Sequence, residues 1–406
     1  ALPIVGLATD DLIDGGSSIH REKLEQLRNK YKFGKWSFDR GRFCGKDLQQ
    51  CSDFSIKVDQ EYYTEGRCNN YIQVPRGAAN DDLASPDMVA QLRTNNGVLS
   101  WIAKETRLDL AGGVCMSQQC FPDPTIADIK LSNKLLREAR DFKDLAITVQ
   151  SIDPDKLCMT ATSDAAWGNA RNKGDGEENL ASQAGYIVMA AHRDLLDGHL
   201  AQVTPLAWRS HTLKRKTAST LSAESQAVGE AAAITAWFRY LLAESMYPET
   251  LKETGSRWEE VTDQLEYGLV TDAKSIYDAL TRPTSTASTI SDKRTAIDLA
   301  IIRDELRRSR GCIRWIDTKH QLADSLTKVM SPDLLRYVIG TGKYQIKDEL
   351  DALRLREAAK KDRAERRQAN QSGHDKMQQQ QQQQHQPPPP QANETMTDDD
   401  SSRKKR

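Results

Sequence analysis

The sequence predicts an α/β fold in which a mixed five-stranded sheet carries helices on its faces. Between residues 157 and 330, short stretches of β-branched and apolar residues alternate with longer stretches of helical periodicity. The first three short stretches follow one another through loops without a helix, which is typical of antiparallel strands. The later ones are separated by helices, which is typical of parallel crossover connections.

The elements of this region can be placed in order. The expected strands are residues 157–164, 185–192, 204–210, 268–272 and 312–316. The expected helices are residues 221–245, 273–280, 292–308 and about 319–328. We expect Thr220 or Ser222 to cap the first of these helices, because a hydroxyl at a helix start accepts a hydrogen bond from a free backbone N–H.

The chain before residue 150 is less regular. A strand is expected at residues 3–8, a helix at 20–32, strand-like segments near 42–44 and 55–58, and a helix-like stretch at 86–103. The chain therefore divides into residues 1–150, residues 155–330 and a tail, residues 331–406. We expect residues 155–330 to fold without the first 150 residues.

The tail is predicted to be a charged helix followed by a disordered segment. Glutamines fill residues 378–384 and prolines fill 387–390, a composition that cannot bury enough apolar surface to fold. The chain ends on the basic residues 403–406. Two interpretations of this end stay open, a nuclear-import signal and a solvated charge run.

Composition excludes several classes of protein. Lys and Arg number 57 against 58 Asp and Glu, a formal charge of -1, so any nucleic-acid contact must use local basic patches. No apolar run approaches the roughly 18 residues of a membrane span, so no membrane partner is expected. The seven cysteines form no CxxC pair, which favours a reduced intracellular chain, in the cytoplasm or the nucleus. Because the chain begins with Ala1, we expect it to be part of a larger product.

Four acidic residues stand at the ends of predicted elements. Asp164 closes the first strand, Glu224 lies near the start of the long helix, Asp272 closes the fourth strand and Asp324 lies in the last helix. Strand ends and helix starts converge at one edge of a mixed sheet, where unpaired carboxylates would repel one another. Divalent cations between them would remove that repulsion, and Mg²⁺ prefers such ligands. The alternative is that these acids serve capping and solubility.

Five sequence blocks contain these acids. They are SDAAW (163–167), ASQAGYIVM (181–189), LAWRSHTLKRKTASTLSAESQAV (206–228), VTDAKSIYDAL (270–280) and DTKHQLADSLTK (317–328). In this order they resemble the ribonuclease H domain of copia-type LTR retrotransposon polyproteins, over roughly residues 155–330. The resemblance implies an RNase H-like sheet and hydrolysis of the RNA strand of RNA–DNA hybrids by a metal-activated water.

The same resemblance implies the roles of individual residues. The four acids, Asp164, Glu224, Asp272 and Asp324, would be catalytic and would bind two Mg²⁺ ions, with Mn²⁺ as a substitute. Two departures from the family stand out. Residues 174–179 (GDGEEN) are acidic where the family usually carries basic and hydroxyl residues. Many ribonucleases H also carry a histidine in a flexible loop before the last acid, whereas His320 here is only four residues, one helical turn, before Asp324. We expect His320 on the last helix as a surface or supporting residue, with a role in catalysis as the alternative.

A basic run precedes the helix that carries Glu224. It offers Arg209, Lys214, Arg215 and Lys216, which suit the phosphate backbone of a duplex. The alternative is a solvated turn. Discrimination of RNA from DNA would use 2′-hydroxyls in the minor groove, and no residue type indicates which side chains contact them.

The N-terminal segment resembles the end of a copia-type reverse-transcriptase palm. GLATDDLIDGG (6–16) would form a strand–turn–strand hairpin that presents Asp10 and Asp11, and NNGVLSWIAKETRLDLAGGV (95–114) resembles the connection to ribonuclease H. The family usually has Tyr two places before the acidic pair, where this chain has Ala8. The earlier palm acid and the fingers are missing, so we expect no polymerase activity. The missing N-terminal part of the polyprotein is a further expected partner.

Two rival functions stay open at this stage. One is a catalytically inactive or repurposed retroelement relic that binds nucleic acid without cleaving it. The other is a different RNase H-like nuclease, such as an integrase or a resolvase. Intact acids argue against the first, whereas the truncated palm and the tail argue for it. The ADSLTK sequence (323–328) together with the palm-like segment argues against the second.

Overall fold

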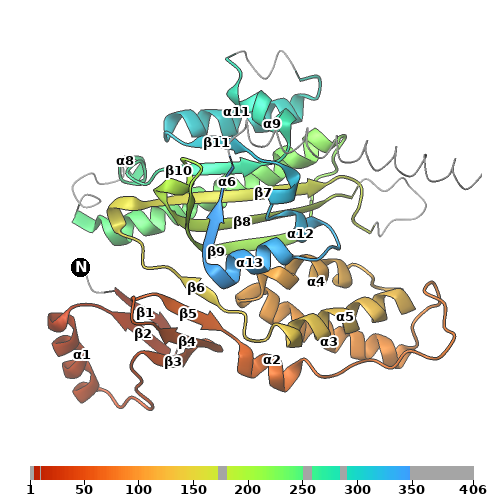
Figure 1. Ribbon diagram of the computed structural model, residues 1–406, viewed down its shortest axis with the longest axis horizontal. Coiled ribbons are helices and arrows are strands. Elements are labelled where there is room, and N and C mark those ends of the chain that lie inside the picture. Colours follow the sequence, from red (N-terminus) through yellow and green to blue (C-terminus); the bar gives the residue numbers. More distant parts are fainter. Residues whose placement is uncertain (1–3, 10, 172–180, 250–257, 284–289, 348–406) are drawn as a thin grey trace, which may run out of the picture. The chain divides into compact units, whose positions relative to one another are not determined.

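A mixed six-stranded sheet forms the centre of the protein. The computed structural model describes residues 4–9, 11–171, 181–249, 258–283 and 290–347. The sheet strands are β7 (Leu157–Ala166), β8 (Gln183–His192), β9 (Leu200–Thr212), β10 (Tyr267–Thr271), β11 (Cys312–Trp315) and β12 (Lys343–Gln345). Their order is β11-β10-β7-β8-β9-β12 (Figure 1). The first three are parallel and the rest pair antiparallel, so the predicted α/β class and mixed sheet are confirmed.

The fold continues past residue 330, where the sequence analysis ended the domain. Helix α13 (Asp333–Thr341) and strand β12 follow, and β12 adds a sixth strand that was not predicted. Tyr344 is the one buried residue of β12, which is too short to show an alternating pattern. The expected boundary was wrong because a three-residue strand that begins with Lys343 and lies close to Lys347 resembles a solvated tail. The glutamine and proline runs lie outside the described residues.

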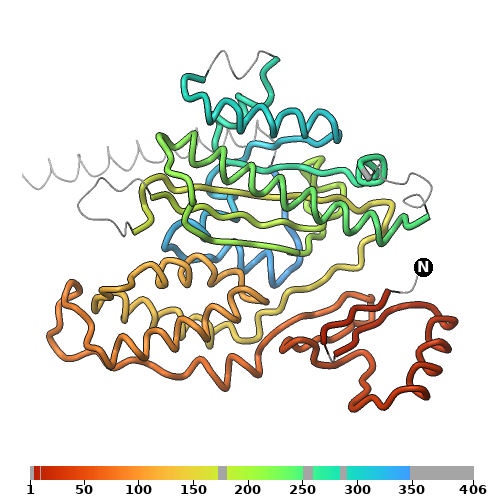
Figure 2. The backbone as a smooth tube through the Cα atoms, turned by 180° about the vertical axis from the view of Figure 1, so that it is seen from behind, coloured from red at the N-terminus to blue at the C-terminus, as the bar shows by residue number. Residues whose placement is uncertain are grey.

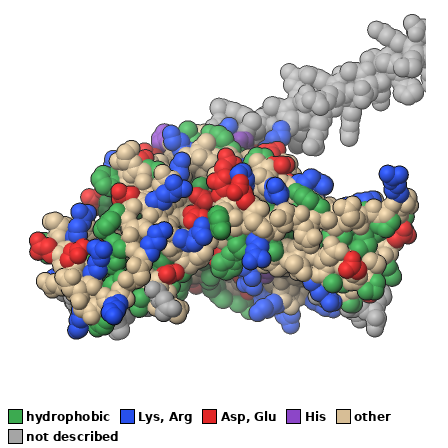
Figure 3. All heavy atoms as spheres, turned by 90° about the horizontal axis from the view of Figure 1, so that it is seen from below, with side chains coloured by type: hydrophobic (Ala, Val, Ile, Leu, Met, Phe, Trp, Pro, Cys, Tyr) green, Lys and Arg blue, Asp and Glu red, His purple; other side chains and the backbone are tan. Residues whose placement is uncertain are grey.

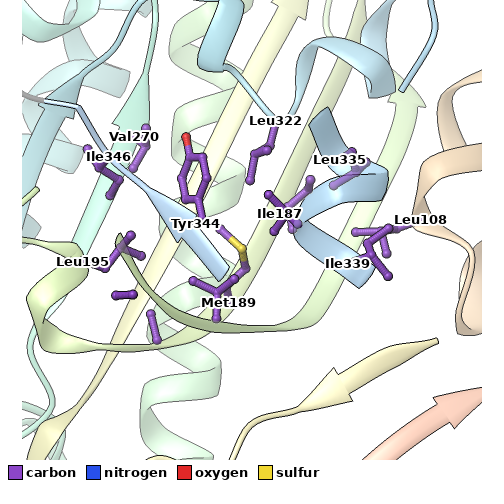
Figure 4. Packing of buried hydrophobic residues seen from close by; sticks show 14 of the residues in the cluster. Leu108, Ile187, Met189, Leu195, Val270, Leu322, Leu335, Ile339, Tyr344 and Ile346 are labelled. Atoms are coloured by element: carbon purple, nitrogen blue, oxygen red, sulfur yellow. The ribbon is translucent and has the colours of Figure 1, made fainter. Parts of the chain in front are cut away.

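Helices cover both faces of the sheet. On one face, α6 (Thr220–Met246), α9 (Lys274–Thr281) and α11 (Lys293–Arg308) pack on Met159, Val188 and Leu269. On the other, α13 packs on Ile187 and Met189, together with Tyr344 (Figure 4). Neighbouring residues of β8 thus belong to different cores, as strand geometry requires. Short helix α8 (Trp258–Thr262) precedes β10.

Two local expectations need correction. The start of α6 is capped by Ser219, whose hydroxyl accepts a hydrogen bond from the backbone N–H of Ser222 at 3.2 Å, and not by Thr220 or Ser222. The predicted last helix is broken into a 3₁₀ turn, η4 (Thr318–His320), and one turn of helix, α12 (Asp324–Thr327). The break occurs because the side chain of Gln321 accepts a hydrogen bond from the N–H of Ala323, replacing a helical partner.

The N-terminal segment contains two small sheets and a group of helices. The strands are β1 (Ile4–Ala8), β2 (Asp11–Gly15), β3 (Arg40–Phe43), β4 (Lys46–Gln50), β5 (Ile56–Asp59) and β6 (Ile147–Val149). The helices are α1 (Ser18–Lys30), α2 (Glu61–Arg67), α3 (Pro86–Glu105), α4 (Ala111–Gln118) and α5 (Ile126–Asp141), with the 3₁₀ turn η1 (Leu108–Leu110) between α3 and α4. Strands β1 and β2 form a hairpin, and β3 to β6 form an antiparallel sheet in chain order. Figure 2 follows the chain through this segment into the central sheet. Two further 3₁₀ turns are η2 (Pro154–Lys156) and η3 (Arg193–Leu195).

The helices of this segment pack into the same core as the central sheet. Leu108 of η1 lies in one apolar cluster with Ile187 and Ile339. Asp109 is buried between two guanidinium groups, Arg107 at 2.8 Å and Arg336 of α13 at 3.0 Å. The residues 1–150 are therefore not a separate body from the residues that follow. Among the described helices, none is long and apolar enough to cross a membrane.

Candidate metal centre

Three of the four predicted acids meet at one edge of the central sheet. Asp164 lies near the end of β7, and Asp272 directly follows β10. The two strands are parallel neighbours, with Val270 opposite Thr162, so their carboxyl ends share an edge. Glu224 comes from α6, which packs against β7. One oxygen of each carboxylate lies within 4.8 Å of one oxygen of the other two.

Glu224 is the acid of this cluster that has a buried oxygen without a hydrogen-bond partner. Its side chain is buried, and its Oε2 atom has no hydrogen-bond partner. A buried carboxylate oxygen without a partner costs free energy unless a proton or a cation compensates it. One oxygen of Glu224 lies within 4.8 Å of an oxygen of Asp164 and of Asp272, so the donor set suits a hard cation at this point.

Asp324 borders the cluster from the helix α12. It is not among the three acids whose oxygens lie within 4.8 Å of one another. Its Oδ1 atom accepts a hydrogen bond from the ammonium of Lys328 at 2.7 Å, and the same ammonium lies 3.5 Å from Oδ2 of Asp164. Lys328 thus links Asp324 to Asp164.

Two further side chains hold the cluster, and neither was predicted from the sequence. The amide of Gln321 donates to the carbonyl of Ser163 at 3.0 Å and lies 3.4 Å from Oδ1 of Asp272. The hydroxyl of Thr327 donates to Oδ2 of Asp164. Both lie in the sequence block that contains Asp324 (317–328), and this proximity was the one indication in the sequence that they lie near the cluster. Neutral residue types gave no reason to select them.

Burial raises the pKa values of three carboxyl groups at this edge of the sheet, those of Asp164, Glu224 and Asp324. Burial raises the pKa of Asp164 to about 6, and the charge of Asp272 adds to this shift, while Lys328 opposes it. Burial also raises the pKa of Glu224 well above its usual value, with Asp164 and Asp272 contributing. The pKa of Asp324 is raised by burial as well. For Lys328, burial disfavours the ammonium, but Asp164 and Asp324 outweigh this and raise its pKa.

This shift predicts a pH dependence of stability in the metal-free protein. The pKa of Asp164 rises from 3.8 to about 6 on folding, so the folded state holds this proton more tightly, and the residue destabilises the fold as pH rises through that interval. The penalty should reach up to about 3 kcal/mol above pH 7. Urea unfolding with EDTA at pH 5 and pH 8 measures it. Asp164→Asn should gain more stability over the wild type at pH 8 than at pH 5, because at pH 5 only part of the interval has been crossed; an equal difference at both values would contradict the shift.

Neither the predicted histidine, His320, nor Asp11 of the N-terminal acidic pair belongs to the cluster of three acids. His320 is in the turn η4 and not on a helix; burial lowers its pKa, and its carbonyl accepts a hydrogen bond from the hydroxyl of Tyr344 at 2.9 Å. Asp11 is exposed at the start of β2. Asp10 and the acidic residues 174–179 lie outside the described residues. The hairpin expected around the acidic pair is present as β1 and β2.

Arg209 of the basic run lies in β9, and Lys214, Arg215 and Lys216 lie between β9 and α6. Arg209, Lys214, Arg215 and Lys216 are all exposed, and Arg215 pairs with Asp298 of α11. Trp167 stands beside this run, because its indole N–H donates to the carbonyl of Thr217 at 3.1 Å. On the face drawn in Figure 3, basic side chains are interspersed with acidic ones.

Helix α4 of the N-terminal segment supports the position of Asp324. Gly112 of α4 approaches α12 so closely that a Cβ atom there would lie 2.0 Å from the carbonyl oxygen of Ser325. Gly185 of β8 approaches from the other side, where a Cβ atom would lie 2.4 Å from that of Leu326. The single turn of α12 is therefore held between two glycines that are far apart in the sequence.

Gly112→Ala should destabilise the protein by about 1–3 kcal/mol, because the added methyl meets backbone that cannot yield without moving α12. Gly97→Ala is the matched control, since a Cβ atom at this position within α3 meets nothing within 4 Å. It should stabilise the protein by up to about 1 kcal/mol through helix propensity. Thermal unfolding compares the two variants. An increase in stability for both would show that α4 does not clamp α12.

Comparison with known proteins adds no assignment. No protein-family model matches the chain, and no curated protein matches it either.

Proposed function

We propose that the chain is the ribonuclease H region of a copia-type retroelement polyprotein, and that it hydrolyses the RNA strand of RNA–DNA hybrids with Mg²⁺. The observation that carries the proposal is the buried cluster of Asp164, Glu224 and Asp272 at the carboxyl edge of parallel strands, with one oxygen of Glu224 unpartnered. The strand order, three parallel strands followed by antiparallel ones, and a long helix across the sheet suit an RNase H-like fold.

The residues present fit the metal that this function requires. All the candidate ligands are carboxylates, the donors that Mg²⁺ prefers. Bound Mg²⁺ would supply positive charge for the scissile phosphate and lower the pKa of a water molecule. Asp164, Glu224 and Asp272 would hold it, with Asp324 at the border. Gln321 and Thr327 would keep Asp272 and Asp164 in position through their hydrogen bonds.

A duplex would reach the cluster across the side that bears Trp167 and the basic run. The Trp167 side chain is 46% exposed, although it follows Asp164 by only three residues and is held by a hydrogen bond. A fixed, exposed indole beside a catalytic edge suits stacking against a sugar or a base. The hairpin of β1 and β2 would correspond to the end of a reverse-transcriptase palm.

The test is cleavage of a labelled RNA–DNA hybrid by the full chain, with Mg²⁺ and with EDTA. Mg²⁺-dependent cuts confined to the RNA strand, leaving 5′-phosphate and 3′-hydroxyl ends, would support the proposal. Binding of the hybrid without cleavage would indicate an inactive relic instead. Cleavage of double-stranded DNA would indicate an integrase- or resolvase-like nuclease.

The basic run should contribute to hybrid binding and not to chemistry. Replacing Lys214, Arg215 and Lys216 with Ala should weaken binding at low salt and flatten the dependence of log affinity on log salt by up to roughly three units. The pairing of Arg215 with Asp298 should reduce its share. Single-turnover cleavage at saturating enzyme should change little. An unchanged salt dependence would make the run a solvated turn, and a collapse of saturating cleavage would mean that these side chains position the phosphate.

A further inference from the structure

The ammonium of Lys328 occupies the position between the fourth acid and the rest of the cluster. Its Nζ atom lies 2.7 Å from Oδ1 of Asp324 and 3.5 Å from Oδ2 of Asp164. Both carboxylates belong to side chains that are at most 10% exposed, so little water screens the contact. A cation bound by Asp164 and Asp324 together would need the space that this ammonium fills.

The charges on this edge are unevenly distributed. Lys328 contacts Asp164 and Asp324, whereas Oε2 of Glu224 has no partner. The edge therefore offers one cation position that is already filled by the chain and one that is not. A divalent ion at the first position would have to compete with Lys328, and an ion at the second would not.

The side chain of Lys328 can leave the cluster while its main chain stays in place. Its backbone N–H donates to the carbonyl of Asp324 at 3.0 Å, which fixes the main chain at the end of α12. The side chain is 42% exposed and reaches the cluster from the solvent side. A lysine side chain has several rotatable bonds, so the ammonium can move into water while the backbone stays in place.

We infer that Lys328 is an internal counter-ion that stands in for the second divalent cation and must withdraw before that cation binds. This inference rests on the proposed function, since it assumes that the acids bind Mg²⁺. It predicts ordered binding: a first ion enters at Asp164, Glu224 and Asp272, and a second, weaker ion enters beside Asp324 in place of the ammonium. Lys328 would thereby set the Mg²⁺ concentration at which both positions fill.

Calorimetric titration of Mg²⁺ into the full chain, without nucleic acid, tests the inference. Wild type should show a tighter and a weaker event. Lys328→Gln should tighten the weaker event by about tenfold, because the competing charge is gone. Lys328→Arg should leave it as weak as in wild type. Lys293→Gln, which removes the same charge from an exposed position at the start of α11, should change neither event.

Thermal unfolding gives a second readout. In EDTA, Lys328→Gln should unfold at a lower temperature than wild type, because the carboxylates lose their counter-ion, and excess Mg²⁺ should abolish this difference. Mg²⁺ affinities in Lys328→Gln that equal or fall below those of wild type would overturn the inference and leave the proposed metal site intact. Absence of Mg²⁺ binding in wild type and variants alike would overturn both.

Discussion

Asp272→Asn should reduce cleavage of an RNA–DNA hybrid by roughly a thousandfold, equivalent to about 4 kcal/mol of transition-state stabilisation. The substitution keeps the size of the side chain and replaces one of the three clustered carboxylates by a neutral amide. The backbone carbonyl of Asp272, which accepts a hydrogen bond from the indole of Trp315 at 3.0 Å, is unaffected. The fold should therefore persist, and hybrid binding should change far less than cleavage. Initial rates with Mg²⁺, together with binding measured in EDTA, separate the two effects.

Asp304→Asn is the matched control for this prediction. Asp304 is exposed on α11, so the same change of charge occurs away from the carboxylate cluster. Its cleavage rate should stay within about twofold of the wild-type rate, in keeping with the small effect of an isolated surface substitution. Equal rates for Asp272→Asn and wild type would remove Asp272 from the proposed chemistry.

The middle of the central sheet could be predicted from the sequence because β7 and β8 are long strands. The ten residues of β7 and of β8 are almost entirely buried, which gives runs that only a covered sheet tolerates. The acids at strand ends could be predicted for the same reason, since once β7 and β10 are parallel neighbours, Asp164 and Asp272 must share an edge. The pairing of the strands thus also determines where these two acids lie.

The supporting residues could not be predicted, because their roles depend on partners distant in sequence. Gln321 bonds to Ser163, which is 158 residues away, and Arg336 bonds to Asp109 across 227 residues. Neither side chain differs in type from an ordinary surface residue. The same applies to Lys328, whose sequence context indicates only a basic residue near the end of a helix. The contacts of these side chains, not their residue types, distinguish them, and those contacts depend on the tertiary fold.

The limits of the folded unit lead to the last prediction: a chain that ends at Met330 should not fold, although the sequence alone places the domain boundary there. This truncation removes α13 and β12, whose buried side chains are Leu335, Val338, Ile339 and Tyr344, followed by Ile346. Burial of one such side chain contributes about 2 kcal/mol. Their combined loss therefore approaches the whole stability of an ordinary domain, about 5–15 kcal/mol.

The truncation would also unpair β9 along its outer edge and leave Asp109 without Arg336. A chain that ends at Lys347 is the matched control, because it loses only residues outside the described fold and should unfold cooperatively like the full chain. Urea unfolding followed by near-ultraviolet circular dichroism compares the two. If the chain that ends at Met330 unfolds cooperatively at the same urea midpoint as the full chain, α13 and β12 are not needed for a stable sheet. Removal of residues 1–150 from the longer chain should likewise abolish cooperative unfolding, since Leu108 and Ile147 belong to the same apolar cluster as Ile187.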